Sequence, residues 1–263
     1  MKISKEKKGV ILIFLSAVIS LAVLAGMDPI SQDPLYHVFS DSNTIAGILN
    51  ALNVLSNIPY LLVGILGLYK SFQPDTLKVD LENKLAYIIF FFGILLVASG
   101  SGYYHLFPDN QTLVWDRLPM AVAFMSLVSI IIGEFISVKL GRYLLLPLLI
   151  LGLFSVIFWY YTESNGVGDL RIYAFVQYYP VLVMPIILLF FNARYSHTGY
   201  YWLLFGTYAL AKVFEYFDHS IDSFLVVISG HSLKHVISAA GLYLLLKSYE
   251  KREKIQKPRM NAN

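Results

Sequence analysis

The chain has 263 residues, of which 57% are hydrophobic and 14% are charged. Because soluble domains carry about 25% charged residues, this composition excludes an ordinary soluble protein, and the mean hydropathy of +0.63 indicates a protein embedded in a lipid bilayer. The net charge of +3 is too small to indicate nucleic-acid binding, and the lack of cysteine excludes disulfides and thiolate metal sites. Nothing in the sequence indicates an obligatory protein partner.

Eight apolar runs are each close to the length of about 20 residues that a membrane-spanning helix requires. They cover residues 9–26, 46–69, 85–105, 113–138, 143–161, 172–191, 199–217 and 229–247. The connections between them are short, so we expect a single all-α domain, a polytopic helical bundle in the membrane. The first run follows a basic stretch and resembles a signal peptide, but it is long for one, and we expect a retained helix.

The basic residues predict the orientation of this bundle, because Lys and Arg accumulate in cytoplasmic loops. With the amino terminus in the cytoplasm, 16 of the 20 basic residues fall on the cytoplasmic side. The exceptions are Arg117, Arg171, Lys212 and Lys234. An even number of spans then places both termini in the cytoplasm, and the last dozen residues are expected to form a solvated tail.

Three polar residues lie near the border between the third and fourth apolar runs. Ser101 and His105 are four residues apart, so they share one face of the third helix. Asp116 follows a short connection, at the start of the fourth helix. All three are therefore expected at one depth near the outer side of the membrane, where polar groups usually mark function.

A pair of histidines occupies the start of the last predicted helix. His231 and His235 are again four residues apart and lie in its outer half, at the depth of His105. Catalytic zinc sites use three protein ligands and leave an open position for water. The pattern thus predicts that these three histidines bind zinc and that Asp116 takes a proton from the water. The Ser101 hydroxyl is then placed to donate to a developing oxyanion.

This combination resembles the pattern of the CREST superfamily of membrane hydrolases, which has Ser-x3-His, an Asp eleven residues later, and His-x3-His on the last helix. Within it the chain is most similar to the alkaline ceramidase family, especially its bacterial members. The similar stretches are "NVLSNIPYLL" at 53–62, "WDRLPM" at 115–120 and "SGHSLKH" at 229–235.

The resemblance implies a seven-helix core over about residues 41–247, preceded by an added helix and loop at 1–40 and followed by a cytoplasmic tail at 248–263. It implies hydrolysis of the amide bond of ceramide-like membrane lipids, which yields a sphingoid base and a fatty acid. The three motif histidines would hold the zinc, with Asp116 acting on the attacking water and Ser101 supporting the oxyanion. For a bacterial member we expect the inner membrane, with the zinc site toward the extracytoplasmic side.

One departure from the family pattern concerns calcium. Eukaryotic alkaline ceramidases carry an acidic calcium site near the start of the first core helix. Asp41 is present here, but Asn50 and Asn53 stand where carboxylates would bind the ion, so a calcium site is not expected. We interpret the two asparagines as hydrogen-bonding residues between helices.

We interpret most other polar residues near the predicted helices as structural. Lys212 and Glu215 are three residues apart and are expected to pair, and Glu134 is expected to reach water at the inner end of its helix. Gln177 and the tyrosines around it are candidates for binding the substrate amide. The other three histidines are expected to lie in loops and to have no role as metal ligands. They are His37, His197 and His219.

Two other functions fit parts of the pattern. A receptor or binding protein that keeps zinc for structure would have a closed site, with Asp116 as the fourth ligand. A proton-coupled transporter would use the histidines and the aspartate as a relay. Such transporters show inverted repeats or pairs of broken helices, which we do not find in the sequence.

Overall fold

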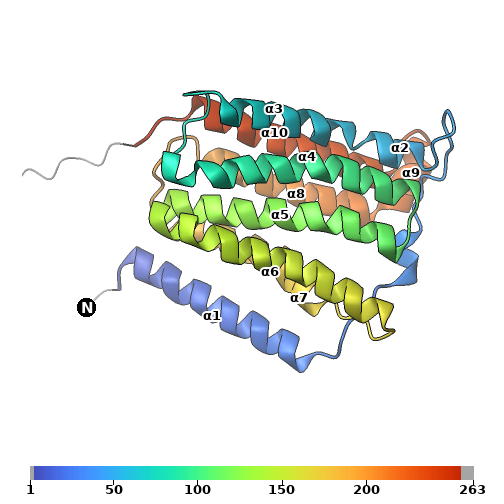
Figure 1. Ribbon diagram of the computed structural model, residues 1–263, viewed down its shortest axis with the longest axis horizontal. Helices are drawn as coiled ribbons and strands as arrows, with labels where there is room; N and C mark the ends of the chain where they lie inside the picture. Colours follow the sequence, from blue (N-terminus) through green and yellow to red (C-terminus); the bar gives the residue numbers. More distant parts are fainter. Residues whose placement is uncertain (1–2, 256–263) are drawn as a thin grey trace, which may run out of the picture.

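The computed structural model describes residues 3–255, and within this range the regular structure is helical (Figure 1). The elements are α1 (Lys5–Gly26), η1 (Pro34–His37), α2 (Ala51–Leu55), α3 (Ile58–Phe72), η2 (Leu81–Asn83), α4 (Lys84–Leu106), α5 (Asn110–Phe135), α6 (Val138–Ser164), α7 (Arg171–Phe190), α8 (Gly199–Tyr216), α9 (Asp218–Leu225) and α10 (Gly230–Lys251). The long helices lie side by side along one direction. The predicted all-α class is confirmed.

Six segments of the described chain are long and apolar enough to cross a membrane. They are α1, α2 with α3, η2 with α4, α5, α6 and α7. The pair α9 and α10, bent by 101°, passes the same criterion and raises the number to seven. α8 is not among them, although it packs along α10 in the bundle. A multi-pass membrane protein is therefore confirmed, whereas the count of eight spans stays a prediction.

Local sequence explains where helix boundaries differ from the expected runs. The run at 46–69 is divided into α2 and α3, and Pro59 lies in the first turn of α3, where a proline needs no backbone donor. α5 begins at Asn110 because Asp109 and Thr112 form a reciprocal capping box. α9 was expected to be part of a connection, and α10 continues four residues beyond 247. The predicted tail at 248 therefore starts too early.

The added helix α1 packs against α7 at the side of the bundle. A β-carbon built on Gly9 would lie 2.6 Å from the Phe190 Cβ, so only glycine permits this close approach. The Tyr179 hydroxyl also donates to the Ile13 carbonyl oxygen at 2.9 Å. The remaining surface of α1 is apolar and exposed, as expected for a helix that faces lipid.

A buried ionic cluster closes the end of the bundle opposite the histidines. Glu134 is 3% exposed and pairs with the Arg252 guanidinium. The carboxylate also accepts hydrogen bonds from Tyr87 and, at 2.9 Å, from Tyr201. Arg252 Nε donates to the Lys78 carbonyl oxygen at 2.8 Å. The expectations that Glu134 reaches water and that residue 252 belongs to a solvated tail were wrong, because the two charges compensate each other inside the protein. Residues 256–263 of that tail lie outside the described range.

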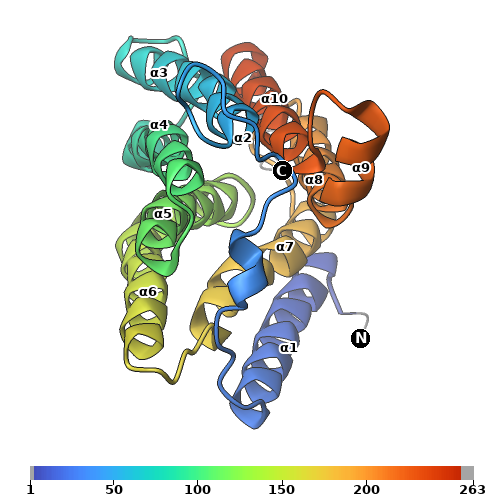
Figure 2. The same cartoon turned by 90° about the vertical axis from the view of Figure 1, so that its right-hand side faces the viewer.

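The segment between α1 and α2, residues 27–50, forms a strap across the other end of the bundle (Figure 2). Its Ile30 carbonyl oxygen accepts the Leu170 N–H at 2.8 Å. The Asn50 side chain donates to the His105 carbonyl oxygen, also at 2.8 Å. These bonds attach the strap to the ends of several helices, directly above the histidines.

Candidate active site

Three histidines meet where α4 ends and α10 begins. His105 lies in the last turn of α4, whereas His231 and His235 lie in the first two turns of α10. Their ligand atoms all lie within 4.8 Å of one another, and all three side chains are buried. The Nε2 atoms of His105 and His231 are 3.2 Å apart. The predicted group is therefore assembled, and it is able to hold a metal ion.

Hydrogen bonds around His235 orient its ring. The Ser56 hydroxyl lies 2.8 Å from His235 Nδ1 and donates to the Asn53 carbonyl oxygen at 3.0 Å. Because the hydroxyl proton is used by Asn53, the serine oxygen accepts the Nδ1–H, which leaves Nε2 with its lone pair free for a metal. Ser56 was missed by the sequence reasoning, since nothing in its local pattern links it to a residue 179 positions away.

The strap shields the other two histidines. The ring centroid of Phe39 lies 4.6 Å from that of His105 and 4.7 Å from that of His231. The His231 backbone N–H donates to Asp218 Oδ1 at 2.7 Å, and Asp218 Oδ2 accepts the Ser40 N–H at 3.1 Å. Phe39 and these bonds cover the cluster from the end of the bundle.

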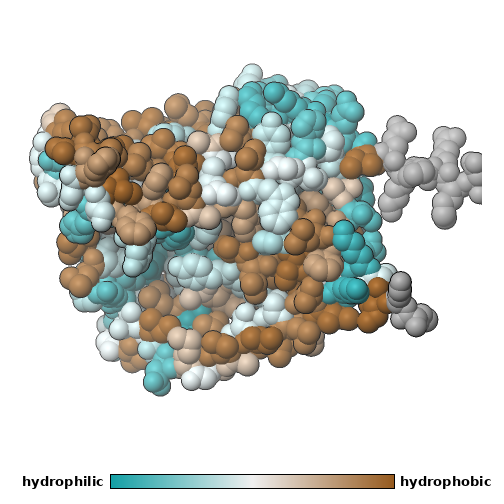
Figure 3. All heavy atoms as spheres, turned by 180° about the vertical axis from the view of Figure 1, so that it is seen from behind, coloured by the Kyte–Doolittle hydropathy of each residue, from teal (hydrophilic) through white to brown (hydrophobic). Residues whose placement is uncertain are grey.

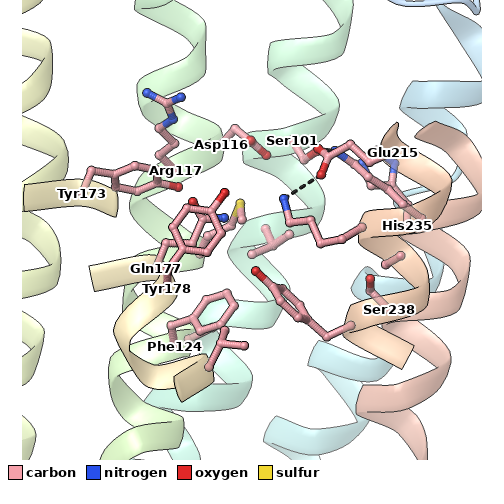
Figure 4. Close-up of a pocket in the computed structure, with 18 of the residues that line it drawn as sticks. Ser101, Asp116, Arg117, Phe124, Tyr173, Gln177, Tyr178, Glu215, His235 and Ser238 are labelled. Carbon is pink, nitrogen blue, oxygen red and sulfur yellow. Dashed lines mark hydrogen bonds and ion pairs between the residues drawn. The ribbon is translucent and has the colours of Figure 1, made fainter. Parts of the chain in front are cut away.

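Ser101 and Asp116 lie beside the histidines. Ser101 is one turn before His105 on α4, and Asp116 lies in the second turn of the neighbouring α5; both side chains line the same cavity. Figure 4 shows these two side chains close together at one end of the pocket. Their approach depends on Gly100, where a β-carbon would lie 2.0 Å from the Trp115 carbonyl oxygen. The expected grouping of all five residues is therefore present.

A cavity of about 670 Å³ extends from this group into the bundle. All five residues line it, and its deeper walls are apolar, formed by Phe90, Ile94, Leu127, Met184 and Leu242. Both α7 and α8 line the cavity, and they pack less closely against each other than against their other neighbours. The face in Figure 3 is hollowed near the end that carries the histidines, and hydrophilic residues are visible there within a largely apolar surface.

Several other polar residues line the same cavity. Lys212 and Glu215 pair as predicted, with 2.6 Å between Nζ and Oε2. The structure adds Lys234, whose Nζ lies 2.6 Å from the other Glu215 oxygen. Gln177 is also in the lining, as is its neighbour Tyr178. Helical spacing indicated the first pair, but Lys234 comes from another helix, so no spacing rule connects it to Glu215.

The asparagines bridge helices as expected. Asn53 Oδ1 accepts from Ser232 Oγ at 2.8 Å, which connects α2 to α10, and Asn50 contacts α4 as described above. The Asp41 carboxylate accepts the backbone N–H groups of Asn43 and Asn53 at 3.2 and 2.9 Å. Asp41 thus has a structural role in holding the strap.

The remaining histidines lie outside the cluster. His37 in η1 bonds through its ring nitrogens to Tyr104 and Asn110, at 3.0 and 2.9 Å. His197 and His219 are exposed. Among the described residues, the metal-capable group contains only the three predicted histidines.

Comparison with known proteins assigns the chain to a family. The Ceramidase family model matches residues 39–259, which include every site residue described above. The chain belongs to the ceramidase family. No curated protein matches the chain.

The ceramidase match begins within the strap, so α1 and the start of the strap lie outside the matched region. The resemblance in sequence to the ceramidase family is thereby confirmed. Family membership indicates a hydrolase of amide-linked lipids, and the apolar helices indicate a protein of the lipid bilayer.

Proposed function

We propose that this ceramidase-family protein is a zinc-dependent intramembrane amidase of the CREST superfamily. In this proposal it hydrolyses ceramide-like lipids to a sphingoid base and a free fatty acid. The observation that carries it is the convergence of three buried histidines with Asp116 and Ser101 at one end of an apolar cavity. Membership of the family over residues 39–259 supports the same reaction.

The geometry of the histidines fits zinc. In a tetrahedral site with Zn–N bonds of about 2.0–2.1 Å, ligand nitrogens lie about 3.3 Å apart, close to the 3.2 Å between His105 and His231. The metal-capable group has three histidines and no carboxylate among the described residues, so a zinc ion held by them would have a fourth position available to water. An open position supports a catalytic site over the closed site expected of a zinc-containing receptor.

The side chains of this site suit amide hydrolysis. Zinc, when bound, polarises the amide carbonyl and makes the attacking water more acidic. Asp116 takes the proton from this water as the C–O bond forms, and the Ser101 hydroxyl donates to the developing oxyanion. Asp116 then returns the proton to the nitrogen as the C–N bond breaks, which releases the amine and the fatty acid.

The cavity supports a lipid substrate that enters from the bilayer. Its deep apolar walls suit an acyl chain. The strap covers the histidines from the aqueous end, whereas α7 and α8 line the cavity and pack only weakly against each other. We propose that the lipid passes between these two helices.

We also propose that both termini lie in the cytoplasm and that the histidines lie near the extracytoplasmic side of a bacterial inner membrane. The start of α1 and the end of α10 lie at the end of the bundle opposite the strap. Basic residues gather there, and Lys139, Arg194 and Lys254 line one surface hollow. This asymmetry supports the orientation through the positive-inside rule.

The proposed reaction is tested with purified full-length protein in detergent. N-acyl sphingosine is supplied, and released sphingosine and fatty acid are measured together with bound zinc. Asp116→Asn is expected to keep its zinc and lose at least about a hundredfold in turnover, because it lacks the base. Glu82→Gln, at an exposed carboxylate, serves as the matched control. Unchanged turnover in Asp116→Asn would contradict the role of this residue.

A further inference from the structure

Three cationic side chains line the cavity beside the residues assigned to the reaction. They are Arg117 on α5, Lys212 on α8 and Lys234 on α10. Charged groups at membrane depth are unfavourable unless a partner compensates them. The charges around these three residues therefore indicate which ligand the cavity accepts.

The two lysines share a single carboxylate. Lys212 and Lys234 each lie 2.6 Å from a different oxygen of Glu215, and no other carboxylate in the described chain pairs with them. Their side chains are 38% and 18% exposed. An ammonium group has three donors, and the hydrogen bond to Glu215 uses one on each lysine. Donors and net positive charge therefore remain available to a ligand in the cavity.

Arg117 has only uncharged partners in direct contact. Its Nη2 donates to the Gln32 side-chain oxygen at 2.6 Å, and its guanidinium lies 4.1 Å from the Trp159 ring centroid and 4.7 Å from that of Tyr173. Within residues 3–255 no carboxylate lies within ion-pair distance of it. It adds a positive charge that direct ion pairing does not compensate.

The carboxylates of the lining are distributed unevenly among these cations. Glu215 is shared by the two lysines, and Asp116 lies beside Ser101. Asp33, the third carboxylate of the lining, is exposed to solvent and accepts the Leu35 N–H in the strap. Two of the three carboxylates therefore lie beside the three cations inside the cavity, and a divalent ion held by neutral histidines would add further positive charge.

The lysines lie where a lipid head group would reach. Lys234 lies between His231 and His235 on α10, so its ammonium extends into the cavity from the turn that carries the metal ligands. In an N-acyl amino lipid the head group is attached about three bonds from the amide nitrogen, or roughly 4–5 Å at about 1.5 Å per bond. The histidines and both lysines line the same cavity, so the head group shares one compartment with the lysines when the amide lies at the histidines.

We propose, on the basis of the function proposed above, that Lys212 and Lys234 form an anion subsite that selects N-acyl lipids with a phosphorylated head group over neutral ceramide. Two ammonium groups suit a phosphate, which accepts several charge-assisted hydrogen bonds. Hydrolysis of either lipid releases an amine that becomes an ammonium next to three cations. The phosphate offsets this charge, whereas a neutral lipid has no group that does so.

A matched pair of substrates tests this selectivity. N-acyl sphingosine and its 1-phosphate, with the same acyl chain, are given to the purified full-length protein. We expect kcat/KM to be at least about tenfold higher for the phosphate, the effect of one charge-assisted contact. The double variant Lys212→Gln/Lys234→Gln is expected to remove this preference, because it lowers kcat/KM for the phosphate more than kcat/KM for the neutral lipid. Lys212→Arg/Lys234→Arg keeps the charges and is expected to keep the preference, and Lys247→Gln, far from the cavity, is the control for a lost lysine.

Binding separates this proposal from the reaction itself. In the Asp116→Asn variant, the phosphate lipid is expected to raise the melting temperature more than the neutral lipid does, and inorganic phosphate at equal concentration is expected to have little effect. Preferred binding of the phosphate lipid by Asp116→Asn, together with no hydrolysis of either lipid by the wild type, would retain the subsite and refute the amidase. Equal hydrolysis and equal binding of both lipids would retain the amidase and overturn the subsite. Stabilisation by inorganic phosphate alone would show a site for free anion and overturn selection of the lipid.

Discussion

The Nε2 atoms of His105 and His231 lie 3.2 Å apart although 126 residues separate them in the chain. Each histidine lies on the terminal turn of a long helix, His105 at the end of α4 and His231 at the start of α10. A hydrogen bond holds the backbone of each turn. The Asn50 side chain donates to the His105 carbonyl oxygen, and the Asp218 side chain accepts the His231 backbone N–H. These hydrogen bonds from the strap and from α9 help to position the two histidines next to each other.

Removing two of the histidines should remove the metal. Purified wild-type protein is expected to contain about one zinc per protomer, whereas His231→Ala/His235→Ala should contain little, because one imidazole cannot hold the ion. The measurement is elemental analysis of both proteins, purified without added metal. His219→Ala, at an exposed histidine of α9, is the control for loss of a histidine. A folded wild type that stays free of metal after zinc is supplied would refute the site.

Ser56 should influence metal affinity without contacting the metal. Its hydroxyl fixes the tautomer of His235, so Ser56→Ala leaves the Nδ1–H without a partner. Loss of such an outer partner typically weakens metal binding about 10–100-fold. Competition with a zinc chelator measures the affinity, and Ser99→Ala, whose hydroxyl bonds within α4, is the control. Equal affinities in Ser56→Ala and the wild type would mean that another group orients the ring.

Gly100 should control the distance between Ser101 and Asp116, the side chains proposed to be catalytic. A β-carbon here would lie 2.0 Å from the Trp115 carbonyl oxygen, so Gly100→Ala must move α4 away from α5. A displacement of about 1 Å at a reacting group can lower the rate about a hundredfold, and we expect that loss in kcat. Gly102→Ala is the matched control, because its β-carbon meets nothing within 4 Å. Equal activity of both variants would show that Ser101 and Asp116 tolerate the shift.

The site could be predicted from sequence because its residues follow helical spacing. Ser101 and His105, like His231 and His235, recur at four residues, so each pair had to share a face and a depth. The family pattern then joined the two pairs. Contacts between residues on different helices that no helical spacing connects were missed. Examples are the contact of Ser56 with His235 and that of Lys234 with Glu215.

The predictions for Glu134 and Arg252, at the end of the bundle opposite the histidines, were wrong for a related reason. A single carboxylate near a helix end usually reaches water, and no local pattern connects Glu134 to a residue 118 positions later. Only the tertiary fold brings Arg252 back into the bundle. Hydropathy predicted eight spans, and this number stays a prediction. α8, which is not among the six candidate spans, carries Lys212 and Glu215, and both residues line the cavity.

The buried pair at that end should be strongly coupled. Glu134→Gln alone leaves the Arg252 guanidinium buried without a counter-charge, which typically lowers the free energy of unfolding by about 3–5 kcal/mol. Glu134→Gln/Arg252→Met removes both charges and is expected to recover part of this loss. Thermal unfolding of the wild type, both single variants and the double variant completes a mutant cycle. Strictly additive effects would show that the two charges act independently.

The cap of α5 gives a prediction that depends on pH. The Thr112 backbone N–H donates to Asp109 at 2.7 Å and holds the pKa of this carboxyl below its ordinary value of 3.8. A carboxyl with a lowered pKa in the folded state stabilises the protein above its unfolded-state pKa, and this stabilisation is lost as the pH falls through the folded-state pKa.

Asp109→Asn separates the charge from the cap. Asparagine still caps a helix, so this variant should lose less stability near pH 7 than Asp109→Ala, for which about 1 kcal/mol is typical. The melting temperature of the wild type should exceed that of Asp109→Asn above about pH 4, and the difference should shrink as the pH falls below that range. Thermal melts of the three proteins between pH 3 and pH 7 measure this. A difference between wild type and Asp109→Asn that does not change with pH would mean that the charge of Asp109 does not contribute to the cap.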